Sequence, residues 1–171
     1  MIVEDGTGLL NADSYVSTEY ADSYFSARGV SEWVALTTSK KEQLLIKATD
    51  FIDNIYQWYG KKEFETQALR FPRVDIRDYE GAEIKGIPTC LKQAVCDASL
   101  IAMSGDLFQT KNENGDVVSE TITTLSFTYA HTDKSEQTTQ TTLYDSINTK
   151  LRGLFKEPSN NKMLSGKVAR V

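Results

Sequence analysis

One segment of the sequence mixes aromatic and cationic side chains closely enough to hold a single nucleic-acid strand. Single strands bind to proteins by stacking bases on exposed rings while cations follow the phosphates. The same pattern also suits a loop that Phe64, Phe71 and Pro72 pin to a core, with its arginines in water. Both interpretations stay open at this point. The side chains that would contact a strand are Trp58, Lys61, Lys62, Arg70, Phe71 and Arg73.

Residues suited to enzymatic chemistry are few. Cys90 and Cys96 fall in one predicted helix, where they would point about 240° apart and lie about 9 Å apart along the axis, so we interpret them as small buried hydrophobes. With His131 as the single histidine, the thiols cannot form a four-ligand zinc site without carboxylates from elsewhere. No glycine-rich phosphate loop occurs. We expect no catalytic, cofactor or metal site, and no enzyme.

The composition indicates one globular domain with appendages. The chain has 171 residues, of which 40% are hydrophobic and 25% charged, with a net charge of −5 and a pI near 5.0. A chain of this length can bury a core without disulfides or a structural metal. The acidic balance argues against a general polyanion binder, which usually has a basic face. We expect neither a membrane span nor a secretory leader.

Two segments have the strongest helical periodicity. Over residues 39–59, Ser39 and Glu42 fit a capping box, and Gly60 is the predicted stop. A second helix is predicted over residues 88–105, with Pro88 in its first turn. The predicted core stripes are Leu44, Leu45, Ala48, Phe51, Ile52, Ile55 and Tyr59 in the first helix, and Leu91, Ala94, Val95, Ala98, Ile101 and Ala102 in the second.

Shorter elements are predicted around these two helices. One helix should begin with Ser17 or Thr18 as its N-cap, and a turn over residues 31–36 should place Trp33 and Val34 in the core. Residues 60–87 are predicted to form an irregular connection with at most a short strand. Further elements are a hairpin within residues 112–130 and a last helix over residues 142–155 with Leu143, Ile147, Leu151 and Leu154 on one face.

The predicted fold is mainly α: a helical bundle of about four helices with a small β-hairpin appendage and extended termini. Residues 1–12 should form an N-terminal arm, and residues 158–171 an extended C-terminal tail. The helical domain spans residues 13–157 and includes the hairpin insertion near 112–130.

Charge is distributed unevenly along the chain. Residues 1–27 have a net charge of −5, and residues 145–171 have a net charge of +4. An acidic head and a basic tail favour contact between identical subunits in the head-to-tail geometry that closes into rings. The alternative is two solvated termini whose charges serve only solubility.

Several sequence blocks resemble a family of tailed-bacteriophage proteins. They are MIVEDGTG at residues 1–8, NADSYVS at 11–17, ADSYF at 21–25, QALRFPR at 67–73, and the Ile87-Pro88 helix start. Members of that family are often named DnaT-like single-stranded-DNA-binding proteins. Their genomic position and architecture, however, are similar to those of head-to-tail adaptors, which form a ring beneath the portal.

The adaptor description implies a structural virion protein of the neck, made in the host cytoplasm, in a ring of about twelve identical subunits. Its partners would be the portal protein, a downstream tail or nozzle protein, and genomic DNA that passes without sequence-specific binding; no membrane is involved. An acidic chain suits a channel along which DNA slides. The resemblance places portal docking in the tail, at Lys162, Met163, Leu164, Lys167, Val168 and Arg170, and leaves single-strand binding as the alternative.

Overall fold

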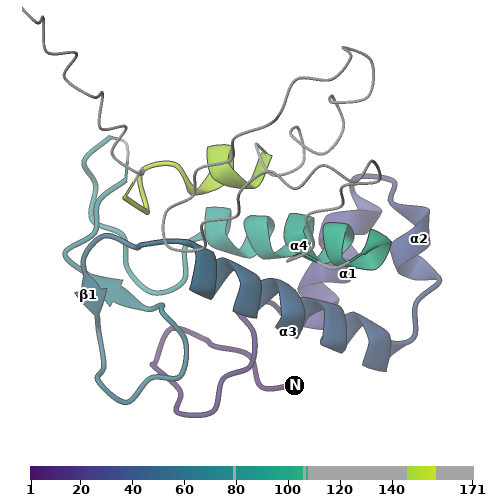
Figure 1. Ribbon diagram of the computed structural model, residues 1–171, viewed down its shortest axis with the longest axis horizontal. Helices are drawn as coiled ribbons and strands as arrows, with labels where there is room; N and C mark the ends of the chain where they lie inside the picture. The colour runs from purple at the N-terminus through teal and green to yellow at the C-terminus, as the bar shows by residue number, and fades with distance from the viewer. Residues whose placement is uncertain (79, 106, 108–145, 157–171) are drawn as a thin grey trace, which may run out of the picture.

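The computed structural model describes residues 1–78, 80–105, 107 and 146–156, and within them the fold is mainly helical, as predicted. A short helical stretch at residues 146–151 lies on the outer side of the last long helix (Figure 1). The predicted hairpin at 112–130, the predicted tail, His131 and Leu143 lie outside the described residues. The named elements are α1 (Thr18–Ser26), α2 (Ser31–Val34), α3 (Thr38–Ile55), β1 (Lys61–Lys62), β2 (Arg73–Val74) and α4 (Thr89–Ser104).

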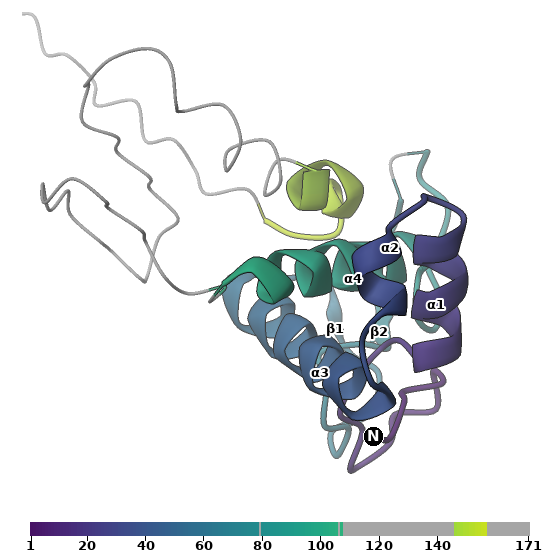
Figure 2. The ribbon, with the colours of Figure 1, turned by 90° about the vertical axis from the view of Figure 1, so that its right-hand side faces the viewer.

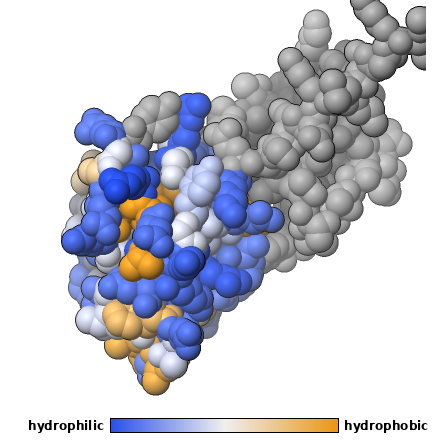
Figure 3. All heavy atoms as spheres, turned by 90° about the vertical axis from the view of Figure 1, so that its left-hand side faces the viewer, coloured by the Kyte–Doolittle hydropathy of each residue, from blue (hydrophilic) through white to orange (hydrophobic). Residues whose placement is uncertain are grey.

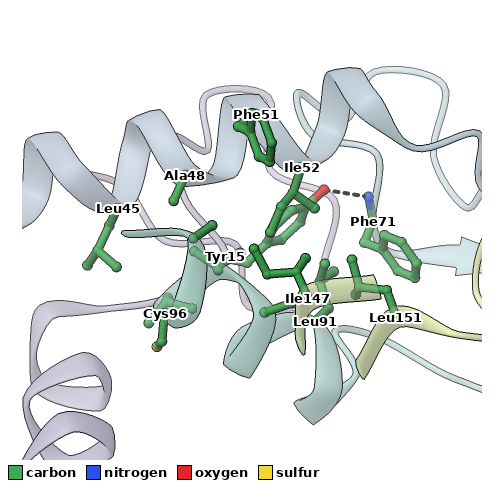
Figure 4. Close-up of a cluster of buried hydrophobic side chains, with 14 of the residues drawn as sticks. Tyr15, Leu45, Ala48, Phe51, Ile52, Phe71, Leu91, Cys96, Ile147 and Leu151 are labelled. Atoms are coloured by element: carbon green, nitrogen blue, oxygen red, sulfur yellow. Dashed lines mark hydrogen bonds between the residues drawn. The ribbon is translucent and has the colours of Figure 1, made fainter. Parts of the chain in front are cut away.

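The core forms between α3 and α4, which pack against each other more extensively than any other pair of elements (Figure 2). Small side chains on α4 let the helices approach closely, since Ala94 and Ala98 are fully buried. Cys96 is also fully buried, whereas Cys90 is half-buried. The side chains drawn in Figure 4 converge from both helices, the N-terminal segment and residues 146–151 on one apolar centre.

The ends of α3 differ from the prediction at both termini. Thr37, not Ser39, is the N-cap, because its side chain accepts the Lys40 backbone N–H at 3.3 Å. The helix ends at Ile55 instead of continuing to Gly60, and Tyr56 is extended. Tyr59, predicted to lie in the stripe, is therefore 43% exposed. Packing further along the chain decides this end, since Tyr56 contacts the ring of Phe155 with centroids 4.6 Å apart.

The α1–α2 corner follows the prediction except at one residue. Ser17 caps α1 by accepting the Tyr20 N–H at 3.2 Å. Trp33 is fully buried, as predicted, but Val34 is 66% exposed. Consecutive helical residues project about 100° apart, and in this short turn Trp33 faces the core while Val34 faces solvent. The Trp33 indole N–H donates to Asp22 at 2.7 Å, and that carboxylate also pairs with Lys41 at 2.8 Å.

The N-terminal arm is folded around a buried carboxylate. Glu4 is 1% exposed and accepts the backbone N–H groups of Gly6, Gly8 and Leu9 at 2.8–2.9 Å. Val3 bridges to Ser14, which closes the loop on itself. The arm therefore has its own hydrogen-bonded structure in the single chain. Sequence reasoning missed Glu4, because nothing local marks an acidic residue as buried.

The stretch at residues 146–156 is attached to the core along its length. Ile147 and Leu151 are fully buried, and Leu154 is 3% exposed. Backbone hydrogen bonds attach the end of the stretch to residues 57–59. The Tyr59 N–H donates to the Leu154 carbonyl at 2.9 Å, and the Lys156 N–H donates to the Gln57 carbonyl at 2.7 Å. The predicted apolar face of this helix is thus confirmed within the described residues.

Candidate nucleic-acid interface

One segment has side chains that could stack on the bases and neutralise the phosphates of a single strand. It follows α3 and forms a small two-stranded sheet. β1 and β2 pair antiparallel, with Lys61 opposite Val74 and Lys62 opposite Arg73. Gly60 makes the approach possible, because it adopts φ +68° and a Cβ there would lie 2.1 Å from the Val74 carbonyl oxygen. The peptide bond between Phe71 and Pro72 is cis. The sheet lies beside the end of α3, on the side of the molecule that Figure 3 faces.

Two of the predicted stacking rings belong to the core. Trp58 is 7% exposed and Phe71 is fully buried, and their rings meet edge to face with centroids 5.0 Å apart. A base cannot reach the face of either ring in this conformation. The indole N–H of Trp58 is buried and has no hydrogen-bond partner among the described residues. Both rings therefore act as the anchors of the loop, which is the structural interpretation left open by the sequence.

Two of the four predicted cations are also used internally. Arg73 donates from Nε to the Tyr59 carbonyl at 2.7 Å, from Nη2 to the Gly60 carbonyl at 2.8 Å, and from Nη1 to the Arg70 carbonyl at 3.1 Å. Its guanidinium thus ties β2 to the turn before β1. Lys62 donates from Nζ to the Gln67 carbonyl at 2.9 Å. The side chains of Lys61 and Arg70 are exposed.

A polar network fixes the loop before β2. The Tyr15 hydroxyl donates to Asp53 Oδ1 at 2.6 Å and accepts the Phe71 N–H at 3.1 Å, a bond drawn in Figure 4. The Arg70 N–H donates to Asp53 Oδ2 at 2.9 Å. Burial raises the pKa of Asp53 above its ordinary value, although these hydrogen bonds oppose the rise. Burial and the adjacent Asp53 also raise the pKa of Tyr15 well above 10, so its hydroxyl stays protonated.

A few side chains of the segment remain accessible. Tyr59 is 43% exposed and Phe64 is 39% exposed, and the Phe64 ring lies against Gly8, where a Cβ would meet it at 2.2 Å. Figure 3 shows this side of the molecule as mainly hydrophilic, with small separate hydrophobic patches. The accessible part of the candidate interface is therefore Tyr59, Lys61, Phe64 and Arg70.

Acidic side chains interrupt the accessible cations. Glu63 and Glu65 lie between Lys61 and Arg70 in the sequence and are exposed, and Asp75 follows β2, also exposed. A surface that tracks a phosphate backbone has clustered positive charge. Here each accessible cation has a carboxylate nearby in the sequence, so the segment is not a continuous basic stripe.

A second polar cluster attaches residues 146–151 to α1 and α4. The Tyr24 hydroxyl donates to Asp97 Oδ1 at 2.7 Å, and Lys150 pairs with Asp97 and donates to the Tyr24 oxygen at 3.0 Å. Ser146 donates to Asp97 Oδ2 at 3.1 Å, and the Arg28 guanidinium lies 3.5 Å from the centre of the Tyr24 ring. Burial lowers the pKa of Lys150, but its bonds to Asp97 and Tyr24 outweigh that effect and raise it.

The described residues offer no reactive or metal-binding constellation. No group of three or more His, Cys, Asp or Glu side chains in them could hold a metal ion. Burial raises the pKa of Cys96 to about 12 and also raises that of Cys90, so both thiols stay protonated near neutral pH. Among the helices of that same part of the chain, none is both long and apolar enough to cross a bilayer. The candidate portal-docking residues, 162–170, lie outside it.

Comparison with known proteins gives one family. A family model described as "Putative DnaT-like ssDNA binding protein" matches residues 1–171. No curated protein and no solved structure matches the chain.

Proposed function

The chain belongs to the family described as DnaT-like ssDNA binding proteins, and within it we propose a structural role: a head-to-tail adaptor that forms a ring between portal and tail in a phage virion. The observation that carries this proposal is the internal use of the groups that could grip a strand. Trp58 and Phe71 are in the core and Arg73 holds three backbone carbonyls. These side chains of the candidate segment therefore stabilise the fold and are not free to bind a strand.

The remaining features suit assembly. The core joins α3, α4 and residues 146–156 into one packed unit, which suits a building block of a ring. The net charge of −5 supports a channel wall along which DNA slides without adhering. Residues 158–171 carry three cations and no acidic residue, so they can pair with an acidic portal surface. The entropic cost of ordering this segment would arise only when it docks.

Portal docking gives the direct test. The purified chain should be a monomer that sediments with portal rings, and removing residues 159–171 should abolish co-sedimentation while leaving the helical circular dichroism unchanged. A matched variant that keeps the length but replaces Lys162, Lys167 and Arg170 by Gln separates charge from chain length. Undiminished docking of the shortened chain would remove the tail from this role, and failure of the intact chain to bind portal rings would contradict the adaptor proposal.

The second candidate is the function in the family description, binding of single-stranded DNA. Two observations favour it: the description itself, and the exposed group of Tyr59, Lys61, Phe64 and Arg70 on one segment. Two accessible rings and two cations could stack bases and contact phosphates, at about 1–3 kcal/mol per stacked base. Such a site would be small, and its affinity would fall steeply with salt.

Fluorescence anisotropy of a labelled oligo-dT at about 50 mM salt distinguishes the two candidates. Single-strand binding predicts a salt-sensitive rise in anisotropy that the pair Lys61→Ala and Arg70→Ala removes. Lys47→Ala, an exposed lysine on α3, is the matched control. Arg73 is avoided because its loss would disturb the sheet itself. If the isolated chain leaves the oligonucleotide signal unchanged, the second candidate is excluded while the adaptor proposal stands.

A further inference from the structure

A shallow hollow lies where the last described residues meet the loop after β2. It has a volume of about 430 Å³ and is lined by Tyr59, Asp75, Ile76, Arg77, Glu83 and Gly153. Tyr59 supplies a ring that is 43% exposed, and Val74 beside it is 38% exposed. The hollow thus combines apolar surface with charged walls, and of its lining residues only Tyr59 belongs to the candidate interface described above.

The loop that forms one wall is acidic. Residues 75–83 contain four carboxylates against a single cation, Arg77, which gives a net charge of −3. All four carboxylates, those of Asp75, Asp78, Glu80 and Glu83, are exposed. Asp75 and Glu83 line the hollow, and Glu83 Oε2 also lies 3.7 Å from the Lys85 ammonium nitrogen.

Hydrogen bonds hold this loop in shape. Asp78 accepts the backbone N–H groups of Glu80 and Ala82, and Arg77 donates to the Gly81 carbonyl at 2.7 Å. Asp75 keeps a left-handed φ of 60°, which a non-glycine residue adopts only where its surroundings hold it. The acidic wall is therefore preformed.

The last described residues of the chain lie at the hollow and next to it. Gly153 lines the hollow, and the next residue, Leu154, bonds through its carbonyl to the Tyr59 N–H. Lys156 then donates its N–H to the Gln57 carbonyl at 2.7 Å. Figure 1 shows this stretch running up to the loop that follows β2. The described chain therefore ends at Lys156, beside Gln57 and three residues after Gly153 at the hollow.

The chain beyond this point is complementary to the hollow. Residues 158–171 contain Lys162, Lys167 and Arg170 and no carboxylate side chain, with Met163, Leu164 and Val168 between the cations. We propose that the hollow is a docking site for this C-terminal segment of the same chain. The basic side chains pair with the 75–83 carboxylates, and an apolar side chain lies against Tyr59.

The same chain is the favoured source because of effective concentration. A segment tethered next to its site experiences a local concentration of about 1 mM or more, far above that of a second molecule in a dilute solution. A weak contact between small complementary surfaces is then occupied within one molecule but not between molecules. The docked tail would shield the acidic wall, and a partner that binds the tail would have to displace it. The inference needs no portal and stands apart from the adaptor proposal.

Hydrogen exchange of backbone amides in residues 75–83 tests the contact on the isolated chain. In the intact chain these amides should exchange about fivefold more slowly than in a chain ending at Glu157, the factor expected when the effective concentration is about four times the dissociation constant. A full-length variant with Lys162, Lys167 and Arg170 changed to Gln should resemble the shortened chain. Equal exchange in the intact and shortened chains would overturn the proposal.

A charge swap identifies the partners and the source. Glu83→Lys in the intact chain should abolish the protection, and adding Lys167→Glu and Arg170→Glu should restore part of it. Glu32→Lys, an exposed residue on α2, is the matched control and should leave protection unchanged. Protection that does not change between about 5 and 200 μM protein supports the same-chain contact. Protection that grows with concentration would assign the hollow to a second copy and refute the same-chain proposal.

Discussion

The molecule contains two networks with the same centre and different surroundings. Tyr15 donates to Asp53 at 2.6 Å, and Tyr24 donates to Asp97 at 2.7 Å. The first network is completed by the backbone N–H groups of Arg70 and Phe71, whereas the second is completed by the side chains of Lys150 and Ser146. The Tyr15–Asp53 network therefore depends on the path of the backbone, whereas the Tyr24–Asp97 network depends on which side chains are present.

This difference decides how each attachment can fail. Backbone N–H groups are present whatever the side chain, so the loop before β2 stays tied to α3 through most substitutions of Arg70. The polar attachment of residues 146–151 instead centres on the ammonium group of Lys150, so one substitution removes its charged pair while Ile147 and Leu151 still pack in the core. We infer that the candidate interface is the more robust region and residues 146–156 the more easily released one.

Loss of Asp53 should have the largest effect. Asp53→Ala leaves the Tyr15 hydroxyl and the Arg70 N–H without their acceptor, and two such losses near the core should lower the free energy of unfolding by about 3 kcal/mol. Urea denaturation measures it. Asp50→Ala, at an exposed position one turn earlier on α3, should change stability by at most about 0.5 kcal/mol. Equal losses at both positions would show that the network contributes nothing specific.

Removal of Lys150 should have the next largest effect and a local one. Lys150→Met keeps the length of the side chain but leaves Asp97 without its cation, which should cost about 2 kcal/mol for a partly buried pair. Hydrogen exchange should accelerate in residues 146–156 before it does so in α3. The exposed Lys47→Met on α3 is the control. Acceleration spread evenly over the described residues would contradict the local release.

The helices were predictable because their information is local. The stripes of α3 and α4 and the Ser17 cap follow from the spacing of apolar and capping residues. The start of α3 was mispredicted because Thr37, Thr38 and Ser39 are all competent caps, and nothing in their types selects among them. Its end was mispredicted because Tyr56 and Trp58 leave the helix to pack with residues far along the chain.

The candidate site was predicted as a segment but not as a surface. The sequence shows that rings and cations alternate, but not which of them fold inward. That choice depends on Asp53 and Tyr15, which lie 17 and 56 residues from their backbone donors. A solvated helix carries carboxylates at similar spacings, so Asp53 gives no local sign of its role. Likewise, nothing near Lys150 in the sequence indicates that it pairs with Asp97, 53 residues away.

Removing the two hydroxyl groups compares the networks at smaller scale. Tyr15→Phe leaves the Phe71 N–H without its acceptor and should cost about 2 kcal/mol, whereas Tyr24→Phe leaves Asp97 still bonded to Lys150 and Ser146 and should cost about 1 kcal/mol. Thermal denaturation of both variants at one pH measures the order. Tyr59→Phe, at a residue that is 43% exposed, serves as the control for the substitution itself. The reverse order would mean that the side-chain network, not the backbone network, is the stronger.

The smallest and most specific difference is in pH dependence. Burial raises the pKa of Asp53 above its ordinary value of 3.8, so the folded chain holds this proton more tightly, and stability falls as pH rises from 3.8 through the folded-state pKa. Lys150, with its pKa raised above 10.5, contributes stability that is complete below 10.5 and lost as pH rises through its folded-state pKa. On acidification, the free energy of unfolding of the unaltered chain should therefore rise relative to that of Asp53→Asn. The gap in this free energy relative to Lys150→Met should shrink as the pH rises through the alkaline range in which Lys150 loses its proton. Urea titrations at a series of pH values measure both, and gaps that change over the same pH range would show that the two networks do not titrate independently.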